Sequence, residues 1–279
     1  MKIYDCFTFF NELDLAEIRF KTLWDHVDYF VVAESNLSHS GNPKAYIFSD
    51  NWERFEPYRS KIRLIQVDDM PETNDSWIRE KFQRKCLERG LEDRAPEDVI
   101  IVSDCDEITR PELIEMIKED ENDYDRYVLK IPMFQYKINY MMVKHALSHP
   151  KIAVTRGRSF TDPDQERTYT FDWTPKPANT VTLEHGGWHF SYFGDNDNAI
   201  TKIQNFAHTE TNNPQMVANH NIDYFIANKS GHHGPSHPER FEYVKIDDYF
   251  PECLVDEIEV WRAKDMVIEN AEVSVEDLY

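Results

Sequence analysis

The sequence of 279 residues contains few glycines, few cysteines and few basic side chains, and each scarcity excludes a class of protein. Its eight glycines form neither a G-x-G-x-x-G nor a G-x-x-x-x-G-K-S/T pattern, which excludes the common dinucleotide-binding and P-loop motifs. Its four cysteines stand far apart, without a C-x-x-C pair. We therefore expect reduced, mostly buried thiols, and neither a disulfide framework nor a zinc knuckle.

Lysine and arginine number only 31 against 52 aspartates and glutamates, which gives a net charge of −21. Because nucleic-acid backbones are bound by clustered basic side chains, this balance excludes a broad nucleic-acid surface, and it also disfavours anionic membranes. The hydrophobic share of 41% is enough for a sizeable core, so we place the acidic excess on a folded surface. An anionic substrate would need a bound cation or a few placed bases.

No hydrophobic run is long enough for a signal peptide or a membrane span. Together with the expected reduced thiols, this predicts a soluble, cytoplasmic protein. The length suits one large domain, which we place over residues 1–262, followed by an acidic carboxyl-terminal tail over 263–279 that is expected to fray.

Apolar segments alternate with helix-like segments over the first 120 residues. The pattern predicts strands over 3–10, 29–33, 62–67 and 99–102, and helices over 13–24, 77–91 and from 111 onward. Continuous apolar strands that alternate with amphipathic helices indicate an α/β fold, with a mostly parallel central sheet flanked by helices. Ligands bind beyond the carboxyl ends of such strands, and polar residues recur there in this sequence. They include Asn11, Glu34, Asp104 and Asp106.

The second half of the sequence is richer in aromatic residues and less regular. We expect strands over 127–142, 151–155 and 181–193, and helices over 196–207 and 214–228. Residues 157–179 are rich in proline and charge, which predicts a mobile loop.

The sharpest local feature is Asp104-Cys105-Asp106, which follows the most apolar predicted strand. Two carboxylates at this spacing can hold one divalent cation through oxygen ligands, and Mn²⁺ or Mg²⁺ can then neutralise a departing diphosphate. The same D-x-D spacing recurs at 162–164 and 195–197, as chance allows in so acidic a chain. The position after a buried strand favours Asp104 and Asp106.

The densest basic stretch, residues 77–85, is predicted to lie on a helix. Arg79, Lys81 and Gln83 are candidates for contact with a phosphate at the edge of the sheet. An ordinary solvated helix face explains each of these residues nearly as well.

Seven of the eleven histidines lie at or beyond residue 185. His189 stands on a predicted strand beside Gly186 and Gly187. A histidine on such a strand is more often a core residue than a ligand, but these glycines indicate a close backbone approach, which strengthens the interpretation as a ligand. The adjacent His232 and His233 resemble a metal pair but are expected to be solvated loop residues.

Six segments of the sequence, taken in their order along the chain, together resemble the motifs of one known family. They are 4–15 (YDCFTFFNELDL), 32–36 (VAESN), 77–84 (WIREKFQR), 100–108 (IIVSDCDEI), 186–194 (GGWHFSYFG) and 202–210. This set resembles glycosyltransferase family 17, the family of the β-1,4-mannosyl-glycoprotein N-acetylglucosaminyltransferases. The resemblance covers residues 3 to about 210, and the remaining residues match nothing that we can place.

The resemblance implies a GT-A fold, a UDP-N-acetylglucosamine donor, a glycan or glycoconjugate acceptor and inversion at the anomeric carbon. It implies a metal-binding D-x-D pair, matched by Asp104 and Asp106. Asp106 would bind Mn²⁺ or Mg²⁺ directly, Asp104 would bind the metal or the ribose of the donor, and His189 would complete the protein ligands. It also implies a nucleotide-sugar-binding half over residues 1–120 and an acceptor- and metal-completing half over 121–262.

The resemblance further implies which residues face the donor. Lys202 is similar to a lysine that lies near the phosphates in related enzymes, and with Arg79 or Arg84 it would stabilise the departing nucleoside diphosphate. Asn11 and Glu34 would face the nucleoside. Unlike the animal members, this sequence shows no amino-terminal membrane anchor, so a Golgi location and an N-glycan acceptor are not carried over.

Direct displacement with inversion needs a general base to deprotonate the acceptor hydroxyl, and the candidates are Glu210 and Asp172. Three aromatic residues are candidates either for stacking on sugar faces or for the core. They are Trp173, Trp188 and Tyr192.

Two functions of other classes fit parts of the sequence. A phosphohydrolase of the haloacid-dehalogenase kind would use Asp104 as its nucleophile, but Thr109 stands one residue too late for the D-x-D-x-T/V loop of that class, and the strand comes fourth instead of first. A non-catalytic carbohydrate-binding protein would use the cation and the aromatic residues alone. It would bind sugar without a nucleotide.

Overall fold

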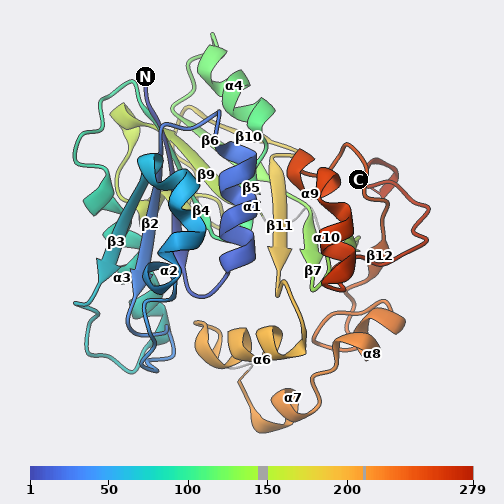
Figure 1. The fold of residues 1–279 in the computed structure, drawn as a ribbon. Coiled ribbons are helices and arrows are strands. Elements are labelled where there is room, and N and C mark those ends of the chain that lie inside the picture. Colours follow the sequence, from blue (N-terminus) through green and yellow to red (C-terminus); the bar gives the residue numbers. More distant parts are fainter. Residues whose placement is uncertain (144–149, 210–211, 279) are drawn as a thin grey trace.

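The computed structural model describes residues 1–143, 150–209 and 212–278, and its main sheet has seven strands in the order β10-β6-β9-β4-β1-β2-β3. These strands are β1 (Ile3–Phe9), β2 (Tyr29–Ser35), β3 (Ile62–Val67), β4 (Val99–Asp104), β6 (Arg126–Lys130), β9 (Pro150–Arg156) and β10 (Thr180–Leu183). The neighbours β3, β2, β1 and β4 run parallel, whereas β9 is antiparallel to both β4 and β6 (Figure 1). The predicted α/β class with a mostly parallel central sheet is confirmed.

Ten α-helices are found in the described part of the chain apart from short 3-10 segments. They are α1 (Leu13–Leu23), α2 (Ile47–Asp50), α3 (Ser76–Cys86), α4 (Pro111–Glu119), α5 (Pro163–Thr168), α6 (Asn196–Asn205), α7 (Pro214–Ala218), α8 (Ile222–Ala227), α9 (Glu252–Asp256) and α10 (Ile258–Ala263). The 3-10 segments are Trp52–Lys61, Leu87–Gly90, Gly157–Ser159 and Glu276–Leu278. None of the helices in the described ranges is long and apolar enough to cross a membrane.

The side chains of β1 point alternately to the two faces of the main sheet, which explains why helices cover both faces. Cys6 belongs to a buried cluster that includes Cys86 of α3, whereas Phe7 belongs to another that includes Phe20 of α1. Successive side chains of a strand point to opposite faces, so an apolar strand needs a helix on each side. The helices predicted over 13–24 and 77–91 are confirmed, although the second changes from α to 3-10 geometry at Leu87.

A second sheet of five strands, in the order β12-β8-β7-β11-β5, joins the two halves of the chain. Its strands are β5 (Glu107–Thr109), β7 (Met133–Gln135), β8 (Tyr140–Met142), β11 (Gly187–Ser191) and β12 (Phe241–Tyr243). The pattern over 127–142 predicted one long strand, and the structure divides it among β6, β7 and β8. Strands of three residues are too short to show a period in the sequence.

Three further expectations for the second half need correction. Residues 157–179 are not simply a loop, because they contain α5, whose first turn is capped by the Asp162 side chain. The stretch 214–228 forms two short helices, α7 and α8, instead of one. The acidic tail packs against the protein, with Val275 fully buried and Val273 paired with Val244.

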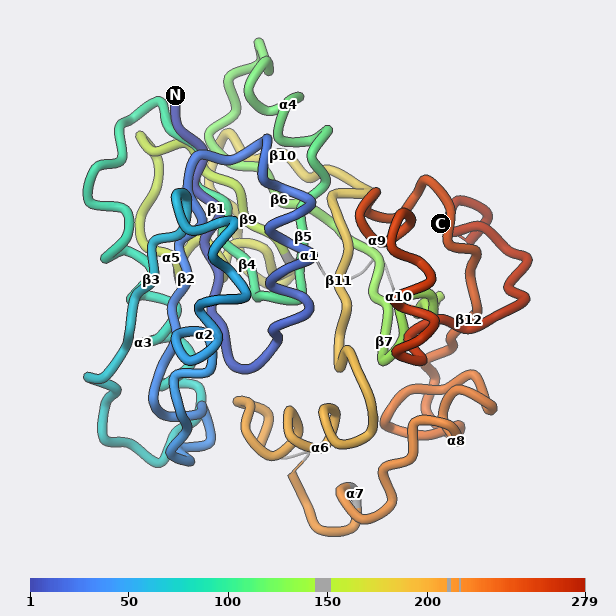
Figure 2. Tube along the Cα trace, in the orientation of Figure 1, coloured from blue at the N-terminus to red at the C-terminus, as the bar shows by residue number. Residues whose placement is uncertain are grey.

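The helices of the second half lie in two groups beside the sheets. Figures 1 and 2 show α6, α7 and α8 gathered at one end of the molecule, beyond the end of β11. They also show α9 and α10 beside β7 and β11. The end of the molecule that carries α6 is also the end toward which the parallel strands point.

Candidate active site

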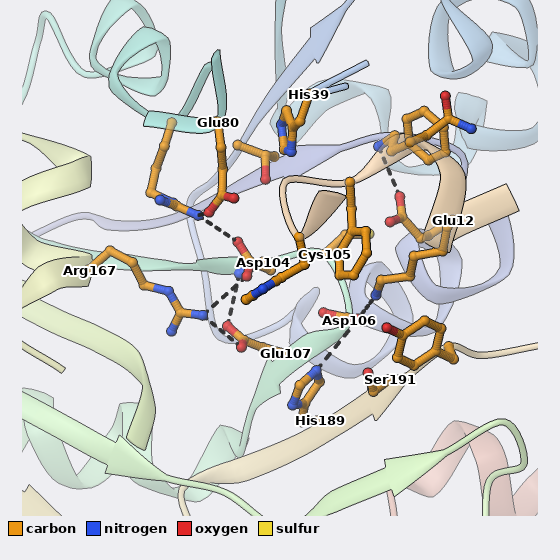
Figure 3. A pocket seen from close by; sticks show the side chains of 18 of the residues that line it. Glu12, His39, Glu80, Asp104, Cys105, Asp106, Glu107, Arg167, His189 and Ser191 are labelled. Atoms are coloured by element: carbon orange, nitrogen blue, oxygen red, sulfur yellow. Dashed lines mark hydrogen bonds and ion pairs between the residues drawn. The ribbon is translucent and has the colours of Figure 1, made fainter. Parts of the chain in front are cut away.

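A cavity of about 1050 Å³ lies at the carboxyl ends of β1, β2 and β4. Residues of α3 and α5 line it on the side of the main sheet, and residues of β7, β11 and α6 line it on the other (Figure 3). The parallel strands therefore place the cavity where the sequence pattern predicts a ligand site.

The acidic turn at the end of β4 is held from beneath by a buried arginine. Arg19 of α1 donates to both carboxylate oxygens of Asp5 in β1, at 2.6 and 2.5 Å, and neither residue is exposed to solvent. The same guanidinium donates to the backbone carbonyls of Asp104 (3.0 Å) and Glu107 (2.7 Å), and to Ser103 Oγ (2.7 Å). These bonds hold the backbone of the turn through its carbonyl oxygens.

Asp106 is buried at the centre of the site. Lys202 Nζ of α6 lies 2.6 Å from Asp106 Oδ2, and His189 Nε2 of β11 lies 3.6 Å from the same oxygen (Figure 3). Burial alone would raise the pKa of Asp106, but the Lys202 ammonium and the His189 ring outweigh it and hold this pKa well below its usual range. Burial alone would lower the pKa of Lys202, but the Asp106 carboxylate outweighs it and raises this pKa above its ordinary value. Both groups are charged at neutral pH.

Asp104 points toward a different set of partners, two buried arginines. Its carboxylate lies 3.1 Å from Arg167 of α5 and 3.4 Å from Arg84 of α3. Arg167 also donates to Glu107 at 2.8 Å, and the second Glu107 oxygen accepts the Asp104 backbone N–H at 3.0 Å. Arg84 bonds Asp164 as well. The site therefore alternates carboxylates and guanidinium groups, and Figure 3 shows Arg167 pointing toward Asp104 and Glu107.

A glycine brings His189 close to the acidic turn. Strand β11 pairs antiparallel with β5, and this register puts His189 opposite Glu107. A Cβ atom at Gly187 would lie 2.0 Å from the Ile108 carbonyl oxygen, so a side chain at 187 cannot fit between the two strands. The close backbone approach predicted from the two glycines is present, and the partner of the approach is strand β5.

The residues around Asp106 suit a divalent cation. Asp106, Glu107 and His189 each offer a ligand atom, and these atoms lie within 4.8 Å of one another. His189 Nδ1 is buried and has no hydrogen-bond partner among the described residues. Two carboxylates with one imidazole form a set that suits Mn²⁺ or Mg²⁺. The structure brings the predicted ligands Asp106 and His189 together and adds Glu107, while Asp104 as a direct ligand stays a prediction.

The residues predicted to face the donor are found in different places. Lys202 and Arg84 line the cavity, but Arg79 lies outside its lining and donates to the backbone oxygens of His39 and Thr73. Asn11 is also outside the lining, although its neighbour Glu12 belongs to it.

Glu34, the other residue predicted to face the nucleoside, is completely buried behind the cavity. Its carboxylate accepts the backbone N–H groups of Phe48 and Ser49 at the start of α2, at 2.7 and 3.2 Å. Burial raises the pKa of Glu34 even though these donors and Lys44 oppose the shift. These bonds join α2 to β2, and contact of Glu34 with the nucleoside stays a prediction.

The candidate bases and aromatic residues are also distributed unevenly. Asp172 is exposed and lines the cavity, whereas Glu210 lies outside the described residues. Trp173 lines the cavity with 76% of its surface exposed and stacks on Phe171, at 4.7 Å between ring centroids. Tyr192 lines the cavity as well. Trp188 is a core residue that donates to the Tyr249 backbone oxygen.

Three important residues of this site escaped the sequence analysis, namely Arg19, Glu107 and Arg167. A charged residue on an otherwise apolar helix stripe was the available signal for Arg19, as was an aspartate at position 5 inside an apolar strand. Glu107 directly follows the D-x-D pair, so its position alone was a signal. Arg167 belongs to α5, which lies in the stretch 157–179 that the sequence predicts as a loop, and nothing in the neighbouring residues distinguishes this arginine.

The fold and the site define an α/β protein with a buried carboxylate–imidazole centre at the carboxyl ends of parallel strands. The model of Glycosyltransferase family 17 matches residues 1–250, and the chain belongs to this family. It is similar to the human β-1,4-mannosyl-glycoprotein 4-β-N-acetylglucosaminyltransferase, with 36% identity over 106 residues. The mouse protein of the same name is 35% identical over 106 residues. Both alignments cover 35% of this chain but only 20% of the relative.

Solved structures resemble the chain more distantly. TarS of S. aureus is 14% identical, with a TM-score of 0.37 over 78% of this chain and 70% of that one. The mannosyltransferase PcManGT of Pyrobaculum calidifontis, solved with GDP-Man and Mn²⁺, is 11% identical, with a TM-score of 0.38 over 68% and 56% of the two chains.

Proposed function

We propose that this protein is a metal-dependent, inverting glycosyltransferase that transfers N-acetylglucosamine from UDP-N-acetylglucosamine to a hydroxyl of a glycan, forming a β-linkage. The observation that carries the proposal is the meeting of Asp106, Glu107, His189 and Lys202 in one cavity at the carboxyl end of β4. The GT-A fold implied by the family places its D-x-D pair at the same point. At about 1050 Å³ the cavity matches the largest small-molecule sites, with room for a donor and an acceptor.

In this proposal Asp106, Glu107 and His189 hold the cation, which supplies positive charge to the diphosphate when it is bound. Lys202 and Arg84 add fixed positive charge inside the buried wall of the cavity. Charge placed in advance at the departing diphosphate stabilises the transition state more than it stabilises the ground state. The acidic surface outside therefore does not prevent binding of an anionic donor.

The transfer itself needs a base on the acceptor side. The acceptor oxygen attacks the anomeric carbon, the bond from that carbon to the diphosphate oxygen breaks, and the hydroxyl proton passes to a carboxylate. Asp172 is exposed on the cavity wall next to Trp173, whose open ring face suits a sugar. We propose Asp172 as the base, with Glu210 as the other candidate.

The test is thermal unfolding with nucleotide sugars, with and without Mn²⁺, combined with an assay for donor consumption. We expect UDP-N-acetylglucosamine with Mn²⁺ to raise the melting temperature, because binding stabilises the fold by RT ln(1 + [L]/Kd), or about 2.7 kcal/mol at a free ligand concentration of one hundred times Kd. Asp106→Asn should remove this stabilisation and leave the unliganded protein folded. Asp197→Asn is the matched control, because Asp197 belongs to a D-x-D pair that is exposed at the start of α6.

The outcomes separate the alternatives. Sugar binding that needs neither nucleotide nor Mn²⁺ would identify a carbohydrate-binding protein without transferase activity. Absence of any effect of nucleotide sugars, with or without Mn²⁺, would overturn the proposal. Membership of family 17 already removes the phosphohydrolase alternative.

A further inference from the structure

A second group of metal-ligating side chains lies on the segment between α8 and β12. His233, His237 and Glu239 each offer one ligand atom, and the three atoms lie within 4.8 Å of one another. His237 Nδ1 is 3.3 Å from Glu239 Oε2, and the rings of His233 and His237 have centroids 4.6 Å apart. All three residues line the cavity, and none of them belongs to the Asp106 centre.

These distances are close to those of a loaded site. Ligand atoms about 2.0–2.1 Å from a tetrahedral zinc lie about 3.3–3.4 Å from each other. The His237–Glu239 pair already has this separation. The third ligand atom, on His233, lies no more than 4.8 Å from the other two, so a movement of at most about 1.5 Å is needed, which rotation of this exposed side chain supplies without a change in the backbone.

The backbone of this segment restricts the three side chains before any ion binds. Gly234 has a φ of +80°, its N–H donates to the Gly231 oxygen at 2.9 Å, and the His237 N–H donates to the Gly234 oxygen at 3.1 Å. Pro235 and Pro238 further limit the conformations of the loop. Less entropy is lost on binding when the ligands are already ordered.

The start of the segment is fixed to the second sheet. Gln135 Nε2 of β7 lies 3.1 Å from His232 Nδ1, and the ring centroids of His232 and His233 are 3.9 Å apart. The end of the segment continues into β12. A ligand on this loop is therefore held against the wall of the cavity and not on a free tether.

We propose that His233, His237 and Glu239 bind a zinc-class divalent cation at the rim of the cavity, at a site separate from the Asp106 centre. Two imidazoles and one carboxylate favour Zn²⁺ or Co²⁺, whereas the carboxylate-rich Asp106 centre favours Mn²⁺ or Mg²⁺. Three protein ligands leave a fourth position for water or for an oxygen of a substrate, which is the arrangement of an open zinc site. This inference does not depend on the proposed transferase activity.

The experiment is a titration of tag-free protein with Co²⁺ in the absence of nucleotide, followed by visible absorption, with Zn²⁺ titrated by calorimetry in parallel. We expect the intense visible absorption bands of four-coordinate Co²⁺. These bands should disappear when added Zn²⁺ displaces the Co²⁺. His237→Gln and Glu239→Gln should each weaken binding by at least about tenfold and reduce these bands. Circular dichroism and urea unfolding of each variant establish that it folds.

Two variants serve as controls. Asp106→Asn should keep the cobalt bands, because the sites are separate. His26→Gln should keep the cobalt bands too. His26 Nδ1 lies 2.9 Å from Glu115 Oε1, so this variant removes a histidine–glutamate pair that is not part of the proposed three-ligand site. Unchanged cobalt binding in folded His237→Gln and Glu239→Gln, or loss of the bands in Asp106→Asn, would overturn the proposal. Either result leaves the Mn²⁺-dependent test of donor binding unaffected.

Discussion

Arg19 shows how a residue far from any substrate can determine the shape of the site. It is completely buried, pairs with the equally buried Asp5, and bonds four groups of the segment 103–107. A buried ion pair of this kind adds little net stability compared with apolar residues of the same size, but removal of one partner leaves the other charge without compensation. We infer that the pair is kept because it fixes the acidic turn.

Replacement of Arg19 should therefore be costly. We expect Arg19→Met to lower the free energy of unfolding by about 3–5 kcal/mol, because Asp5 is left buried and unpaired. The double variant Asp5→Leu with Arg19→Met should recover part of this loss. Urea unfolding measures both effects.

The control for this prediction is Arg59→Met, which breaks an exposed pair with Glu56. The arginine and glutamate side chains of that pair are 62% and 55% exposed, so we expect a change within about 0.5 kcal/mol. Equal destabilisation by the two arginine variants would contradict the role assigned to Arg19.

Strands β5 and β11 illustrate at the level of elements what the sequence could and could not predict. The strands β1 to β4 were predictable because each is a short run in which apolar residues predominate. The pairing of β5 with β11 was not, because strands of three and five residues separated by about eighty residues leave no local pattern. His189 could be named as a ligand from its motif, but its place opposite Glu107 became visible only through this pairing.

The pairing of β5 with β11 depends on Gly187, which gives a second mutational prediction. We expect Gly187→Ala to cost about 1–3 kcal/mol, because the new methyl group overlaps the Ile108 carbonyl and forces the strands apart. It should also weaken Mn²⁺-dependent donor binding, since His189 moves away from Asp106. Thermal unfolding with and without Mn²⁺ and donor measures both quantities.

Thr182→Ala is the matched strand substitution, because Thr182 is exposed on β10. It should cost less than about 1 kcal/mol and leave donor binding as it is. If Gly187→Ala behaves in the same way, the close contact between the two strands does not control the site.

The whole molecule carries a net charge of −21, and most of this charge lies on its surface. Self-repulsion of this size destabilises the compact state, and salt screens it. We expect an increase in NaCl from 20 to 300 mM, without metal or nucleotide, to stabilise the fold by about 1 kcal/mol. For a chain of this size the melting temperature should rise by about 2–4 °C.

Differential scanning calorimetry in a buffer of constant pH checks this expectation. The exposed ion pairs of the surface are also screened, but each contributes only about 0–1 kcal/mol. A fall in the melting temperature on addition of salt would mean that these pairs outweigh the repulsion of the excess acid.

Helix α1 begins at residue 13, yet its outer face is completed by the last part of the chain. Helix α9 packs on α1, Lys21 bonds Glu257 at 2.6 Å and Lys264 bonds Asp14 at 2.9 Å. Leu254 and Trp261 are buried in the same cluster as Phe20. During synthesis, α1 must therefore keep an apolar face uncovered until α9 and α10 have left the ribosome. The family match ends at residue 250, but a chain shortened there would expose this face and aggregate.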